Sequence, residues 1–154
     1  MQKPHVPQAM NQAQVQNILK FIDTTLPEAD KAQIFSRLGH ECFYSRNLDA
    51  WIGKYVGNVQ AFLDWVNVEG ASRYWEKLEF NADHTQLVLT GRVVEGCACA
   101  FADCTQPPLA LCQHCCKSLQ EALFSTLFEQ PVEVEITAAF LLGDQRCNTI
   151  IHLV

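Results

Sequence analysis

The sequence predicts an α+β fold in which helices come first and an antiparallel sheet follows. Two observations support this. Apolar residues recur at helical spacing in the first half of the chain, and they alternate with polar residues in two later regions. The resulting order of helices, hairpin, helix and hairpin is typical of helices packed on one sheet. The 154 residues suit a single domain. We divide it into a flexible arm (1–8), a mainly helical part (9–71), and a sheet with a cysteine-rich loop and helix (72–154).

Four helices are predicted in the helical part. The first covers residues 9–26, where apolar side chains keep helical spacing. Residues 25–28, Thr-Leu-Pro-Glu, have the form of a capping box with an early proline, so they predict the start of the second helix. That helix is expected to stop at Gly39, since glycine is common just after a helix end. Two shorter helices are predicted over 47–54 and 59–70.

Two hairpins and one helix make up the remainder. Period-two alternation marks four segments: 77–80, 87–93, 132–137 and 147–154. Turn-forming residues lie between the first two segments and between the last two, so each pair predicts a hairpin. Between the hairpins, apolar residues at helical spacing predict a fifth helix over about residues 112–129. The sheet is therefore expected to be antiparallel.

Charge and hydropathy exclude several kinds of partner. The net charge is −6 and the isoelectric point about 5.2, whereas non-specific nucleic-acid binding needs a basic face. No apolar run approaches the length of a membrane span. Residues 1–16 are polar and lack the apolar core of a signal peptide. We therefore expect a cytoplasmic protein that binds no nucleic acid and has no membrane span.

The eight cysteines are the most informative feature of the composition. Six of them fall within twenty residues: Cys97, Cys99, Cys104, Cys112, Cys115 and Cys116. Disulfide frameworks of secreted proteins usually distribute cysteines along the chain. A dense group in a chain without a signal peptide indicates a metal site or reactive thiols instead.

The spacing of four cysteines predicts a tetrahedral site. Cys97 and Cys99 follow the end of a predicted strand, where alternate side chains point the same way. Cys112 and Cys115 are three apart at a predicted helix start, so both should project from one face. Thiolates are soft donors that suit zinc or an iron–sulfur cluster, and we favour zinc. Buried inert thiols and a redox-active dithiol are the alternatives.

Four further cysteines are weaker candidates. Cys104 and Cys116 lie within the dense group and are additional candidate ligands. Cys147 begins a predicted inward strand face, so it is either a packed core residue or the floor of a cavity shared with the group. Cys42, with the His-Glu pair before it, is a candidate for a second small ligand set. His114 is expected to point away from the thiols, because it lies between two predicted ligands on a helical turn.

The sequence shows no catalytic motif. It has no serine nucleophile elbow, no phosphate-binding glycine loop and no H-E-x-x-H, so enzymatic activity stays uncertain. The aromatic residues are expected to be mostly core. Some of them would line an apolar pocket between helices and sheet for a small apolar or aromatic ligand.

The motifs around the cysteines resemble a known family. The C-x-C at Cys97, the C-x-x-C at Cys112, the aromatic helix end leading into 130–134 and the segment 143–147 are similar to the L-2-amino-thiazoline-4-carboxylic acid hydrolase-like proteins. More distantly, they resemble the 4-vinyl reductase (hydrocarbon-binding) domains. The chain departs from that pattern where Cys116 replaces a small polar residue and Gln130 replaces glycine. Cys116 is therefore an alternative to Cys115 as the metal ligand.

The resemblance implies an α+β fold and binding of small apolar or aromatic molecules. Together with the cysteine pattern, it leads to the hypothesis of a metal-binding, small-ligand-binding module of sensor type. One alternative is a metal- or cysteine-dependent hydrolase of small cyclic substrates. Another is a dimerising interaction protein, since relatives of this fold pair through helix faces. A homodimer is the corresponding partner.

Overall fold

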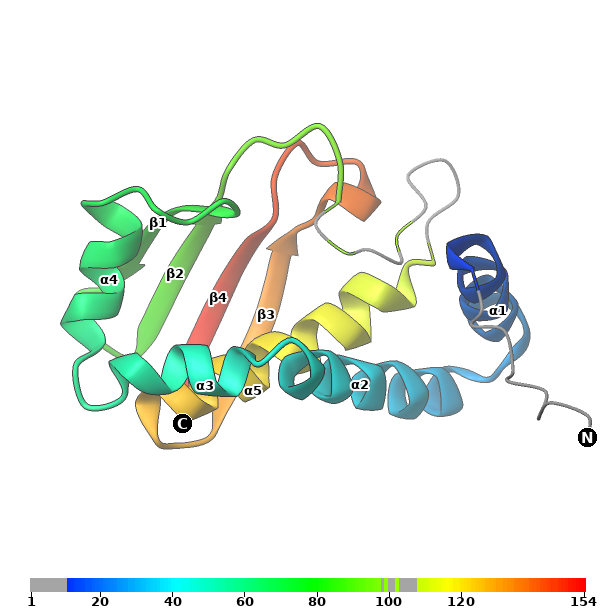
Figure 1. Cartoon of the computed structure of the whole chain (residues 1–154), viewed down its shortest axis with the longest axis horizontal. Helices are drawn as coiled ribbons and strands as arrows, with labels where there is room; N and C mark the ends of the chain where they lie inside the picture. Colours follow the sequence, from blue (N-terminus) through cyan, green and yellow to red (C-terminus); the bar gives the residue numbers. More distant parts are fainter. Residues whose placement is uncertain (1–10, 98, 100–101, 103–107) are drawn as a thin grey trace, which may run out of the picture.

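The computed structural model describes residues 11–97, 99, 102 and 108–154. The predicted arm (1–8) and Cys104 lie outside these residues. The predicted α+β fold is confirmed: N-terminal helices precede a four-stranded antiparallel sheet, and further helical segments lie between its two hairpins. In Figure 1 the helices α3 and α5 run beneath the strands, and α1 lies at the far end from α4.

The first helix, α1 (Gln12–Thr25), has a capping box at its start. The side chain of Asn11 accepts a hydrogen bond from the backbone of Gln14, whose side chain returns one. The capping box predicted for the second helix is wrong. Helix α2 (Glu28–Ser45) begins after Pro27 and has no side-chain cap. Proline fixes its own φ near the value a helix needs, so this start is pre-organised without a cap.

Helix α2 also continues past its predicted end at Gly39. Gly39 is buried and helical, and a Cβ at this position would overlap the backbone carbonyl of Cys115. The glycine therefore serves close packing between two helical segments rather than helix termination. After α2 come the short helices α3 (Leu48–Ile52) and η1 (Gly53–Tyr55), and then α4 (Val59–Asn67).

The sheet consists of two hairpins placed side by side. Strands β1 (Trp75–Phe80) and β2 (Gln86–Gly91) form the first, and β3 (Val132–Ala138) and β4 (Asn148–Leu153) form the second. The strand order is β1-β2-β4-β3, with every neighbouring pair antiparallel. The two central strands, β2 and β4, join the hairpins, and β1 and β3 are the edges.

An aromatic core fills the space between helices and sheet. The ring of Phe62 on α4 contacts the rings of Trp51, Trp65, Trp75 and Phe124. Phe124 lies on α5 (Lys117–Phe128) and is fully buried. These aromatic side chains pack against one another, as predicted for core residues. The contact with Trp65 is stacked and the other three are edge-to-face, and aromatic pairs of both kinds add to the stabilisation from apolar burial.

Asn67, at the end of α4, connects this helix to the edge of the sheet. Its amide nitrogen donates to the carbonyl oxygen of Leu78 at 2.7 Å, and its amide oxygen accepts from the N–H of Leu78 at 2.8 Å. We expect Asn67→Ala to lower the free energy of unfolding by about 2–3 kcal/mol, because both backbone groups of Leu78 would lose their partner. Urea denaturation measures this change.

The matched control is Asn58→Ala, which removes the N-cap hydrogen bond of the same helix. An exposed cap of this kind contributes about 1 kcal/mol. If both variants lowered the free energy of unfolding by the same amount, the role given to Asn67 would be contradicted.

Candidate functional site

The described cysteines gather at the end of the sheet where α2 meets the start of α5. We call the seven described cysteines, all free, the thiol cluster: Cys42, Cys97, Cys99, Cys112, Cys115, Cys116 and Cys147. They come from four separate places in the chain. One lies in α2, two in the segment after β2, three in the helical segment η2 (Leu111–Cys116), and one just before β4. Most belong to a second hydrophobic cluster, apart from the aromatic core.

The segment η2 is a π-helical turn that runs directly into α5. A π-turn is closed by hydrogen bonds over five residues, so it is wider than an α-turn. Residues four apart, rather than three, then lie over one another. Accordingly Cys112 pairs with Cys116 through a thiol–thiol hydrogen bond. This pairing favours Cys116 over Cys115 as the partner of Cys112, while the choice of Cys115 as a ligand stays a prediction.

Cys115 faces α2 instead. Its side chain is 3% exposed, and its thiol forms a hydrogen bond with the thiol of Cys42. Burial, together with the nearby Cys42, raises the pKa of Cys115 to about 12. His40 and Glu41 are exposed on α2. The predicted second ligand set around Cys42 is therefore not assembled among these residues.

The remaining thiols interact with backbone groups. The Sγ of Cys97 accepts a hydrogen bond from the N–H of Cys99 at 3.5 Å, and burial raises the pKa of Cys97 to about 11. The Sγ of Cys147 accepts from the N–H of Phe140 at 3.4 Å, and burial raises its pKa as well. These thiols are therefore protonated at neutral pH when no metal is bound.

Cys112 differs from the others. The hydrogen bond from Cys116 lowers the pKa of Cys112, because it stabilises the thiolate more than burial disfavours it. The same hydrogen bond raises the pKa of Cys116, since Cys116 supplies the proton. As the pH rises, Cys112 therefore loses its proton before Cys116 does.

The raised pKa of Cys115 predicts a pH dependence of stability. The unfolded thiol ionises near its usual pKa of 9.0, whereas the folded thiol ionises near 12. As the pH rises through this interval, the unfolded chain releases this proton first. The free energy of unfolding therefore falls, by about 1.4 kcal/mol per pH unit for one such thiol. We expect metal-free Cys115→Ala to have a shallower slope than the wild type in urea denaturation above about pH 9. Equal slopes would contradict the assignment.

Metal binding by the thiol cluster requires several of its sulfurs to face a common centre. In the described residues, no three His, Cys, Asp or Glu side chains are arranged so that they could hold a metal ion. Four of the sulfurs occur as two pairs, whereas those of Cys97 and Cys147 accept hydrogen bonds from backbone N–H groups. In chemistry and number they fit a soft metal. Cys97 and Cys99 lie in a segment with no helix or strand, so regular backbone hydrogen bonding does not fix their positions relative to η2.

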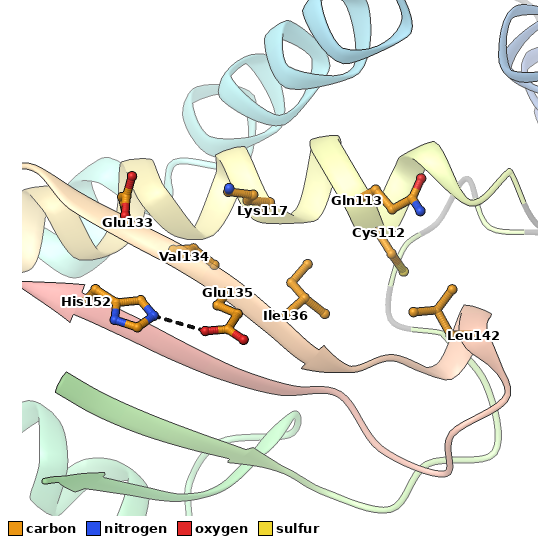
Figure 2. A pocket seen from close by; sticks show the side chains of 9 residues that line it. All are labelled: Cys112, Gln113, Lys117, Glu133, Val134, Glu135, Ile136, Leu142 and His152. Atoms are coloured by element: carbon orange, nitrogen blue, oxygen red, sulfur yellow. Dashed lines mark hydrogen bonds and ion pairs between the residues drawn. The ribbon is translucent and has the colours of Figure 1, made fainter. Parts of the chain in front are cut away.

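A hollow of about 500 Å³ adjoins the thiol cluster at the outer edge of β3. Figure 2 shows it between β3 and the helical segment formed by η2 and α5. Its lining residues are Cys112, Gln113, Lys117, Glu133, Val134, Glu135, Ile136, Leu142 and His152. The sequence predicts a pocket between helices and sheet that aromatic side chains line, but no Phe, Tyr or Trp is among the residues that line this hollow. This lining was not predicted. The Val-Glu-Val-Glu alternation at the start of β3 was the available signal, because it places acidic side chains on one face of the strand and apolar side chains on the other.

His114 points away from the thiols, as predicted. Its Nε2 lies 2.8 Å from the Oε1 of Glu28, at the start of α2. Lys31 and then His114 lower the pKa of that carboxyl group. The contact thus joins η2 to α2 on the surface and leaves the imidazole outside the thiol cluster.

Comparison with protein-family models, with curated proteins and with solved structures found no match. The resemblance to the thiazoline-hydrolase-like family therefore stays a prediction. Among the described helices, none combines the length and hydropathy that crossing a bilayer requires.

Proposed function

We propose that this chain is a metal-binding protein in which the thiol cluster holds zinc or an iron–sulfur cluster, with zinc favoured. The ligands are Cys97, Cys99, Cys112 and Cys116, and Cys147 lies beside them. The observation that supports this most is the convergence of cysteines from separate segments on one partly buried place at the end of the sheet. Four sulfur ligands complete a structural zinc site.

The choice of Cys116 over Cys115 follows from the π-turn. Cys112 and Cys116 share a hydrogen bond and a common side of η2, whereas Cys115 pairs with Cys42 on α2. A metal has a higher charge than the proton that Cys112 and Cys116 share, so it would draw both sulfurs to itself as thiolates. Binding would then link the segment after β2 to η2.

A role in binding small molecules is supported by the hollow beside β3. Cys112 belongs to both the thiol cluster and the lining of the hollow. A molecule in the hollow would therefore lie next to a metal ligand. This arrangement suits a sensor-like module, in which an occupied hollow and an occupied metal site affect each other.

The test is elemental analysis of the full chain purified without oxygen, with a visible spectrum and a count of reactive thiols. We expect about one zinc per chain, with the four ligand thiols protected from a thiol reagent. A broad visible absorption with stoichiometric iron would select the iron–sulfur cluster over zinc. Metal-free protein in which all eight cysteines react, and which takes up neither metal on reconstitution, would overturn the proposal.

A further inference from the structure

The two edges of the sheet differ in what covers them. At the β1 edge, Asn67 of α4 bonds both the N–H and the carbonyl oxygen of Leu78. The β1 edge also carries Lys77, and lysine on an edge strand discourages pairing with another chain. Strand β1 is therefore partly closed by its own domain.

Strand β3 has neither device. It pairs with β4 on one side, and in the part of the chain that the structure describes no strand pairs with its other side. The backbone groups that do not face β4 point outward in an antiparallel strand. No lysine or proline occurs within its seven residues, Val132–Ala138. The hollow of about 500 Å³ lies beside this strand.

The walls of the hollow continue the two faces of β3. Glu133 and Glu135 are exposed on one face, where Glu135 contacts His152 of β4 at 3.2 Å. Val134 and Ile136 lie on the other face, toward η2 and α5. Figure 2 shows Glu135 beside the imidazole of His152, Glu133 farther along the strand, and Leu142 at the far end of the hollow. Leu142 is 52% exposed, so apolar surface remains there for a partner to cover.

We propose that the β3 edge binds an extended peptide segment with alternating basic and apolar side chains, which adds to the sheet as a strand beside β3. In strand addition, main-chain hydrogen bonds supply affinity, and pockets for alternate side chains supply specificity. Basic side chains would lie next to Glu133 and Glu135. Apolar side chains would lie next to Val134 and Ile136.

The charges at the edge favour this partner. No ion pair or hydrogen bond joins the carboxylate of Glu133 to another described residue. Lys117, the one basic residue with a permanent charge among those that line the hollow, lies 3.8 Å from Glu121 on its own helix. A second copy of this chain pairing through β3 would bring glutamates of both copies together, which is unfavourable.

The experiment uses the full chain and three short end-blocked peptides. The first alternates lysine and valine, the second alternates glutamate and valine, and the third has the composition of the first with lysines and valines in separate blocks. We expect only the first to bind, with slower hydrogen exchange at alternate amides of β3. Protection of those amides separates strand addition from attraction by charge alone, because attraction alone would leave the exchange unchanged.

Matched variants locate the site. The double variant Glu133→Gln with Glu135→Gln should bind the lysine–valine peptide about fivefold more weakly, as expected when two exposed charge pairs are lost. Glu79→Gln, on the opposite edge strand, should bind it as the wild type does. Three results would each overturn the proposal: equal binding of the acidic or block peptide, binding without protection of β3, or no binding of the lysine–valine peptide. Protection of β3 that rises with protein concentration and without peptide would also overturn it, since a second copy would then occupy the edge. None of these outcomes depends on bound metal, so this proposal and the metal proposal can fail separately.

Discussion

Replacing Gly39 by alanine is expected to lower the free energy of unfolding by about 3 kcal/mol. In an ordinary helix this change stabilises the protein by about 0.5–1 kcal/mol, because alanine has less backbone freedom to lose than glycine. Here the added Cβ would overlap the carbonyl oxygen of Cys115 and crowd the N–H of Leu119. Both contacts are with backbone, which cannot turn aside as a flexible side chain can. Overpacking of this kind outweighs the gain in helix propensity.

The matched control for this prediction is Gly53→Ala. Gly53 has helical backbone angles, and nothing lies within 4 Å of the position where its Cβ would be. The Gly53→Ala variant should therefore be slightly more stable than the wild type, by about 0.5 kcal/mol. Urea denaturation of both variants gives the comparison. A Gly39→Ala variant as stable as the wild type would show that α2 and η2 do not approach as closely as described.

The position of Gly39 has a counterpart on the sheet. A Cβ on Gly91, at the end of β2, would overlap the backbone carbonyl of Cys147. The backbone thus approaches two cysteines of the thiol cluster closely at two glycines. Gly39 of the helical layer lies against Cys115, and Gly91 of the sheet lies against Cys147. The frame around the cluster is therefore fixed by backbone packing. The segment that carries Cys97 and Cys99 has no such constraint in regular structure.

Most elements could be predicted because their signals are local. The alternation in 132–137 marks β3, and the apolar spacing after Cys112 marks α5. The end of α2 could not be predicted in this way. Gly39 reads as a helix stop until its contact with Cys115 is known, and that contact joins residues far apart in the sequence. Long-range packing therefore overrode the usual preference for glycine at a helix end.

The candidate site was predictable in composition but not in pairing. The density of cysteines identified the thiol cluster, but the π-turn of η2 changes which cysteines lie together. A π-turn cannot be predicted from the sequence, since the same residues also suit an α-turn. The hollow beside β3 was missed for another reason. It depends on which strand lies at the edge of the sheet, and the order β1-β2-β4-β3 is a property of the whole fold.

Single cysteine variants should distinguish the Cys112–Cys116 pair from the Cys115–Cys42 pair by their effect on metal binding. We expect Cys112→Ser and Cys116→Ser each to weaken binding at least about a hundredfold, because changes at residues that only support metal ligands already cost about ten- to a hundredfold. Cys115→Ser should stay within about tenfold of the wild type, since its thiol pairs with Cys42 instead. Competition with a chromophoric chelator at fixed pH measures these affinities.

The double variant Cys97→Ser with Cys112→Ser should release the metal altogether and lower the melting temperature. Metal bound only to the folded state stabilises that state by mass action, and structural zinc contributes on the order of 10 kcal/mol of binding free energy. When both proteins are metal-free, the melting temperatures of the double variant and the wild type should differ much less, because the variant then loses only packing interactions. Cys42→Ser is the control, since Cys42 lies on α2 and contacts Cys115. If Cys115→Ser weakened metal binding as much as Cys116→Ser, the ligand pair would be Cys112 and Cys115, and η2 would have to rewind as an α-turn when metal binds.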